Sequence, residues 1–160
     1  MRIEIGLTLQ EMIALADDQY TDSAIAWQDA RTAQAEQAAD DAHFLVRALQ
    51  ARLAAGAGQD GGLFRPPGDP LDLPRSPRLS DLIAEADSLI QHYSRLAFEH
   101  RDDEGSSYNE SATFARRYRQ LLDGLGAAHG ARERARRDAE RAQQRRVTDR
   151  FASPRMSPSR

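Results

Sequence analysis

The spacing of apolar residues constrains the fold of this chain more than any other feature of its sequence. Over residues 8–54, apolar residues recur every three or four positions, as in Leu9, Met12 and Ala16, which is the spacing of one helix face. The two-residue period of a half-buried strand occurs only in residues 2–5, which are too few to form a sheet alone. The pattern therefore predicts an all-α fold.

The first helical segment is predicted to span residues 8–54. It opens with Thr8 and Glu11, spaced as in a capping box, in which each side chain accepts a hydrogen bond from an amide that the helix leaves free. An unbroken helix of this length would be on the order of 70 Å long. We therefore expect a break near residues 21–23, whose short polar side chains can cap a new helix. A bent helix and a long straight helix both remain possible. The only apolar residue type in residues 31–42 is alanine, so the core that this part of the helix can form is thin.

Residues 55–78 interrupt the helical pattern with five prolines and five glycines. Proline removes an amide donor and glycine adds conformational entropy to the unfolded chain, so this segment is predicted to be a loop or linker. Its apolar residues, Leu63 with Phe64 and residues 71–73, either pin the loop to the helices or contact a partner.

Two further helical segments are predicted in residues 79–126. The apolar face from Leu79 to Ala97 is the clearest in the chain, and a polar turn at 102–106 follows it. A second capping-box sequence, residues 107–110, precedes another stripe that ends among glycines. We therefore expect an antiparallel bundle of three or four helices, in which the long N-terminal helix packs against this hairpin.

The charge of the chain is divided between its two ends. Residues 1–130 contain 12 arginines and 21 acidic residues, whereas residues 131–160 contain 10 arginines and four acidic residues. The second segment has strong helix formers and no apolar stripe, so a solvated helix with a disordered tail from Ser153 is expected. Guanidinium groups at helical spacing suit carboxylates and phosphates. The residues predicted to bind an anionic partner are Arg132, Arg136, Arg137, Arg141, Arg145 and Arg146.

Three interpretations of this arginine-rich segment stay open: a solvated helix without a partner, a helix that docks on an acidic protein surface, and a helix that binds nucleic-acid phosphates. The interleaved acidic residues and the lack of aromatic residues other than Phe151 weaken the third. The segment has no apolar face to bury in a membrane surface.

The sequence lacks the motifs of common enzyme classes. It has no cysteine, no G-x-S-x-G sequence and no phosphate-binding loop of the Walker type. Asp40 and His43 share a helix face, and His100 lies beside Glu99 and Asp102, but neither set has the second ligand pair of a helical-bundle metal site. We therefore expect a protein that is not an enzyme and has no cofactor or metal; a metal-dependent bundle enzyme is a more remote reading.

Amino-acid composition and the lack of targeting segments indicate the source and location of the protein. The chain contains 27 alanines and no lysine, which fits a GC-rich bacterial or phage genome, with selection against lysine as the alternative. No apolar run reaches membrane-spanning length and no signal peptide is recognisable, so the cytoplasm or a phage particle is expected as its location.

The alanine-only apolar material of residues 31–42 and the opposite charges of the two ends of the chain favour a contact function. We therefore predict a helical assembly or adaptor subunit of a larger complex, with a protein partner or further copies of itself. The alternative is a nucleic-acid-binding accessory protein that uses its arginine-rich helix. The residues predicted to pack against a partner are Tyr20, Trp27, Leu45 and Leu49.

Overall fold

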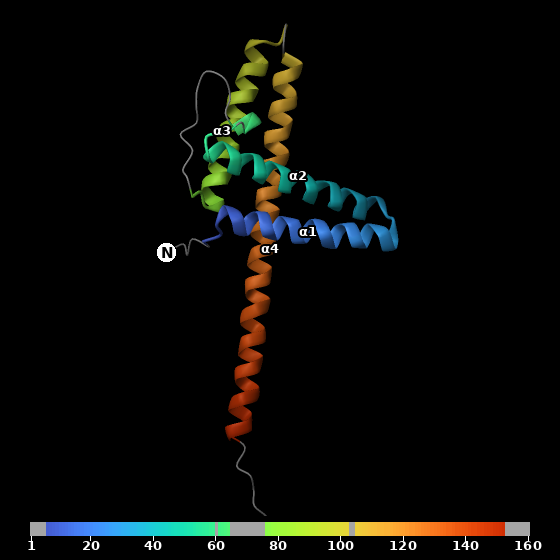
Figure 1. Ribbon diagram of the computed structural model, residues 1–160, viewed down its shortest axis with the longest axis vertical. Helices are drawn as coiled ribbons and strands as arrows, with labels where there is room; N and C mark the ends of the chain where they lie inside the picture. Colours follow the sequence, from blue (N-terminus) through green and yellow to red (C-terminus); the bar gives the residue numbers. More distant parts are fainter. Residues whose placement is uncertain (1–5, 60, 65–75, 103–104, 153–160) are drawn as a thin grey trace, which may run out of the picture. The chain divides into compact units, whose positions relative to one another are not determined.

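The computed structural model of the chain describes residues 6–59, 61–64, 76–102 and 105–152. In these residues the fold is all-α, as predicted, with four α-helices, one short 3-10 helix and no strand. The strand-like residues 2–5 lie outside them. Two compact units are present, Met1–Gly126 and Ala127–Arg160. The helices are α1 (Leu9–Ala30), α2 (Ala33–Gly56), the 3-10 helix η1 (Gly62–Phe64), α3 (Leu79–Glu99) and α4 (Gly105–Ala152). Figure 1 labels the four α-helices.

The first helical segment is two helices, and the prediction of a break at residues 21–23 is wrong. Thr21 stays inside α1, where its hydroxyl donates to the backbone oxygen of Asp17 (3.1 Å) instead of capping a new helix. The chain turns one helical turn after Trp27, where Arg31 takes the left-handed conformation (φ 46°). Thr32 then caps α2 by accepting a hydrogen bond from the amide of Ala35 (3.1 Å).

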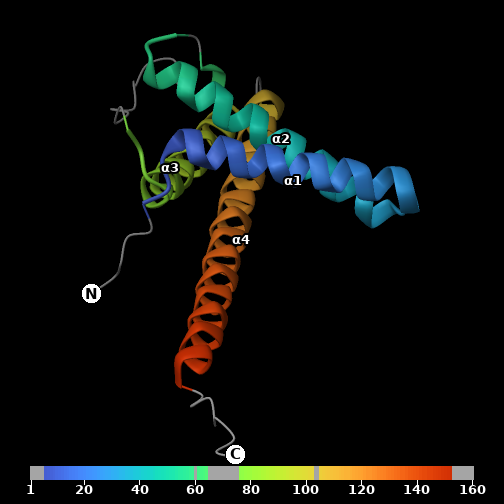
Figure 2. The same cartoon turned by 60° about the horizontal axis from the view of Figure 1, so that its bottom comes forward.

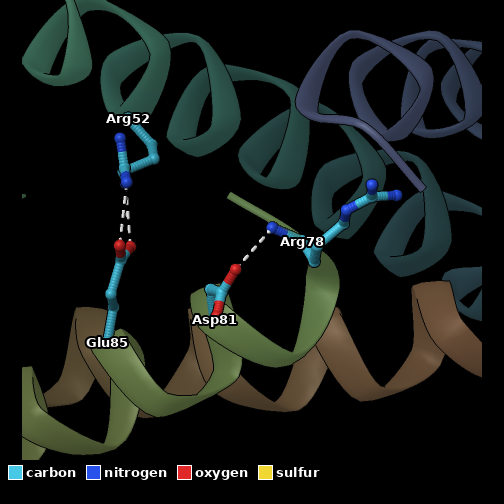
Figure 3. Close-up of polar contacts among 4 residues, drawn as sticks. All are labelled: Arg52, Arg78, Asp81 and Glu85. Carbon is cyan, nitrogen blue, oxygen red and sulfur yellow. Dashed lines mark hydrogen bonds and ion pairs between the residues drawn. The ribbon is translucent and has the colours of Figure 1, made fainter. Parts of the chain in front are cut away.

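At the other helix starts, the observed capping residues agree only in part with those predicted from the sequence. The capping box at Thr8 and Glu11 is present as predicted. For α3, the capping residue is Arg78, whose amide donates to the carboxylate of Asp81 (2.8 Å), as Figure 3 shows. In α4 the predicted cap at Ser107 is wrong, because the helix has already begun at Gly105.

The core of the first unit lies where two helical hairpins meet. Helices α1 and α2 run antiparallel, and the pairing of His100 with Tyr108 and of Asp87 with Arg119 shows that α3 and α4 do the same. The α1–α2 hairpin crosses the other hairpin, whereas the bundle we predicted has all helices alongside one another (Figures 1 and 2). Only the N-terminal part of α1 and the C-terminal part of α2 therefore reach the shared core.

The start of the proline- and glycine-rich segment is anchored to this core. Phe64 of η1 is 1% exposed, and its ring packs edge-on against that of Tyr118 with centroids 5.3 Å apart. The hydroxyl of Tyr93 donates to the backbone oxygen of Leu63 (3.3 Å). At Gly61, a Cβ atom would lie 2.3 Å from that of Ala55, so this close approach requires glycine. The predicted pinning by Leu63 and Phe64 is confirmed, while residues 71–73 lie outside the described part.

The glycines at positions 124, 126 and 130 do not end a helix, contrary to our expectation. Helix α4 continues through them to Ala152. A glycine in a helix interior costs about 1 kcal/mol relative to alanine, which flanking helix formers and the burial of Leu125 offset. In the second unit, the side chains of residues 131–151 are exposed except for that of Glu133. The predicted disordered tail from Ser153 lies outside the described residues.

Candidate protein-interaction surfaces

The outer half of the α1–α2 hairpin, residues 17–41, is here called the hairpin arm. Its tip lies away from α3 in both views (Figures 1 and 2). None of its side chains is buried, although its two helices pack against each other. Tyr20 is 36% exposed and Ile25 is 53% exposed. Trp27 is half-buried beneath the guanidinium group of Arg31, which lies 5.3 Å from the centre of the indole ring. The arm thus presents apolar side chains that no other part of the first unit covers.

Two of the four residues predicted to pack against a partner lie elsewhere. Leu45 and Leu49 are 2% and 0% exposed in the core, because this part of α2 faces α3, α4 and η1. They cannot contact a partner while the unit is folded, so for them the prediction of partner contact is wrong. Sequence reasoning also missed Ile25, which lies on the arm off the apolar stripe of α1. A large aliphatic residue outside the stripe was the signal that could have identified it.

The arginine-rich part of α4 has few internal contacts. Arg136 pairs with Glu133, one helical turn earlier in α4 (2.9 Å). Val147 and Phe151 are 48% and 86% exposed and add isolated apolar surface. The predicted anion-binding arginines are all exposed in the second unit, and their role stays a prediction: Arg132, Arg136, Arg137, Arg141, Arg145 and Arg146.

The candidate metal ligands lie apart. His43 packs against the ring of Tyr20 (centroids 5.3 Å apart), and His100 packs against that of Tyr108 (5.4 Å). Within the described residues, no three histidine, aspartate or glutamate side chains come together as a metal site would require. Among the described helices, none is both long and apolar enough to cross a membrane.

A buried ionic cluster joins α2, α3 and α4. The guanidinium group of Arg52, which is 0% exposed, donates from Nε and Nη2 to the two carboxylate oxygens of Glu85, both at 2.8 Å (Figure 3). Next to the pair, the pKa of Tyr118 is raised, chiefly by burial and further by the charge of Glu85, while Arg52 opposes the shift. Sequence reasoning missed this cluster, although Arg52 continues the apolar spacing of Leu45 and Leu49.

A groove of about 610 Å³ lies between α2, η1 and α4 within the first unit. Its apolar lining includes Phe44 of α2 and Phe114 of α4, whose ring centroids are 4.7 Å apart. Arg117 lies over Phe44 at 4.2 Å and donates to the carboxylate of Asp41 (2.8 Å). The rim also carries Arg47. The groove therefore combines an aromatic floor with positively charged groups at its edge.

Comparisons of this chain with protein-family models, curated proteins and solved structures found no match. The arm, the arginine-rich helix, the ionic cluster and the groove are thus the features from which its function is inferred.

Proposed function

We propose that this chain is a non-enzymatic assembly or adaptor subunit that contacts another protein through the hairpin arm. The observation that carries the proposal is the absence of any buried side chain over residues 17–41. Apart from the ion pair of Asp41 with Arg117, the two helices of the arm pack against each other and bury little apolar surface. Short helices are marginal in water without tertiary packing. A partner that covers Ile25 and the exposed edge of Trp27 would supply the missing burial.

The charge distribution supports a second contact, between the arginine-rich helix and an anionic surface of the same complex. The arm carries seven acidic residues and one arginine, whereas residues 131–160 carry ten arginines and four acidic residues. Opposite potentials at two separate surfaces steer association and determine orientation more than they add affinity. The lysine-free composition supports a bacterial or phage source for this complex.

The arm is tested by replacing Ile25 with glutamate in the full-length chain. We expect the wild type purified from cells to retain a partner protein and the Ile25→Glu variant to lose it, as measured by quantitative mass spectrometry. Phe98→Glu is the matched control, because Phe98 is 68% exposed but lies on α3. The proposal fails if both variants retain the same proteins as the wild type, or if the wild type retains none and is a monomer by light scattering.

The arginine-rich helix is tested by replacing Arg141, Arg145 and Arg146 together with glutamine. The full-length wild type and this variant are titrated with duplex and single-stranded oligonucleotides at two salt concentrations. Protein docking predicts no specific oligonucleotide binding by either. Binding by the wild type that falls steeply with salt and disappears in the variant would instead establish the nucleic-acid alternative, since phosphate contacts release counterions.

A further inference from the structure

The groove between α2, η1 and α4 is not used by the proposed contacts and has the dimensions of a ligand site. Its volume of about 610 Å³ falls in the range of small-molecule pockets, roughly 300–1,000 Å³. It follows α2 from Asp40 to Ala51, a length of ~16 Å at the helical rise per residue. A single extended chain of about ten carbon atoms would fit along it.

The walls of the groove are apolar and incompletely covered. Phe44, Phe114 and Leu63 pack against the core on one side but are only half-buried. Ala48 and Ala51 line the same wall and leave room above the helix because their side chains are small. A bound apolar body would remove these surfaces from water, which favours binding.

The charges at the rim favour an anionic head group. Arg47 is exposed, and it has no hydrogen-bond or ion-pair partner in the part of the chain that the structure describes. Arg117 is held in place by Asp41 and by the ring of Phe44, and its side chain stays 39% exposed. Asp41 balances Arg117, whereas Asp40 lies two helical turns from Arg47, about 10 Å along the axis. One positive charge at Arg47 is thus left for a ligand.

We propose that this groove binds a small amphipathic carboxylate. The apolar body lies along Ala48, Ala51 and Leu63, and the carboxylate accepts hydrogen bonds from Arg47 and from the exposed edge of Arg117. Charge-assisted hydrogen bonds to guanidinium groups select a carboxylate over a neutral or cationic head of the same length. The groove shares only Asp40 and Asp41 with the hairpin arm, and it uses neither Ile25 and Trp27 nor the arginine-rich helix. The carboxylate site can therefore fail while the protein contact holds, and the reverse.

The test is a titration of the full-length, isotope-labelled protein with sodium decanoate, followed by amide chemical shifts. We expect saturable shifts confined to residues 40–51, 61–64 and 114–117. The neutral 1-decanol should bind the same residues more weakly, and decylammonium more weakly still. Equal binding of decanoate and decylammonium, shifts that map elsewhere, or no saturable shift would each overturn the proposal.

Two variants separate the head group from the apolar body. Arg47→Gln should weaken decanoate about tenfold and leave 1-decanol unchanged, whereas Arg95→Gln, an exposed arginine on α3, should change neither. Ala51→Leu should block both ligands by filling the groove while the melting temperature stays within a few degrees of the wild type. An Arg47→Gln variant that binds decanoate as well as the wild type does would exclude the proposed head-group contact.

Discussion

Replacing Glu85 with alanine should lower the free energy of unfolding of the first unit by about 3–5 kcal/mol, because it removes the carboxylate that pairs with a buried arginine. Arg52 is 0% exposed and the Glu85 side chain is 11% exposed, so water screens the pair poorly. Two charge-assisted hydrogen bonds of 2.8 Å are lost together. A domain of this size is stable by about 5–15 kcal/mol, so the loss should be a large share of its total stability.

The assay is urea unfolding of the full-length chain, followed by circular dichroism. Asp87→Ala is the control, because the Asp87 side chain is 54% exposed and its partner Arg119 also pairs with Asp123, so this ion pair should contribute less than about 1 kcal/mol. A double variant, Arg52→Met with Glu85→Leu, replaces the pair by apolar side chains of similar size and should be as stable as the wild type or more so. It also provides a folded comparison if Glu85→Ala does not fold.

Two results would refute this reasoning. The first is a loss of less than about 1 kcal/mol in Glu85→Ala, which would place the pair among surface ion pairs. The second is a double variant that is destabilised as much as Glu85→Ala, because the cost would then come from lost packing and not from a buried charge without its partner.

Three further predictions concern the first unit. The pKa of Tyr118 is raised above its usual 10.0, so the unfolded chain loses this proton at a lower pH than the folded chain does. The free energy of unfolding should therefore fall above about pH 10, by up to about 1.4 kcal/mol per pH unit. In urea unfolding at about pH 9 and pH 11, Tyr118→Phe should lose less stability between the two pH values than the wild type does. Thr32→Ala should cost about 1 kcal/mol, because Thr32 caps α2, and an unchanged urea midpoint would contradict this. Gly124→Ala should add about 0.5–1 kcal/mol to the free energy of unfolding, since a Cβ there meets nothing within 4 Å. Gly126→Ala should gain less, because its Cβ would lie 3.0 Å from Leu79, and urea unfolding of the two variants measures the difference.

Much of the helical architecture was predictable from local patterns. The capping box at Thr8 and Glu11 forms as expected, and the apolar periodicity identified the helical segments. Leu63 and Phe64 were singled out as large apolar residues of a segment rich in glycine and proline, with packing on the helices and contact with a partner both left open; the buried ring of Phe64 shows the packing. Such features depend on residues within one or two helical turns of each other, which is the range over which a sequence pattern carries information.

The position of the helix break shows where local patterns fail. Thr21 and Thr32 are both threonines that can cap a helix, yet Thr21 bonds back to the preceding turn and only Thr32 caps. Likewise, the glycines at 124 and 126 resemble a helix end but lie inside α4. In both cases two local conformations differ by about 1 kcal/mol, which is small enough for tertiary contacts to reverse the local preference.

The candidate surfaces depended on long-range packing even more strongly. Leu45 and Tyr20 follow the same kind of periodic pattern, but Leu45 is buried in the shared core whereas Tyr20 stays exposed on the arm. The partners Arg52 and Glu85 are 33 residues apart and become neighbours only where the hairpins cross. A one-dimensional pattern shows which side chains can leave water, but the crossing of the helices determines which of them do so, because burial is a property of the assembled core.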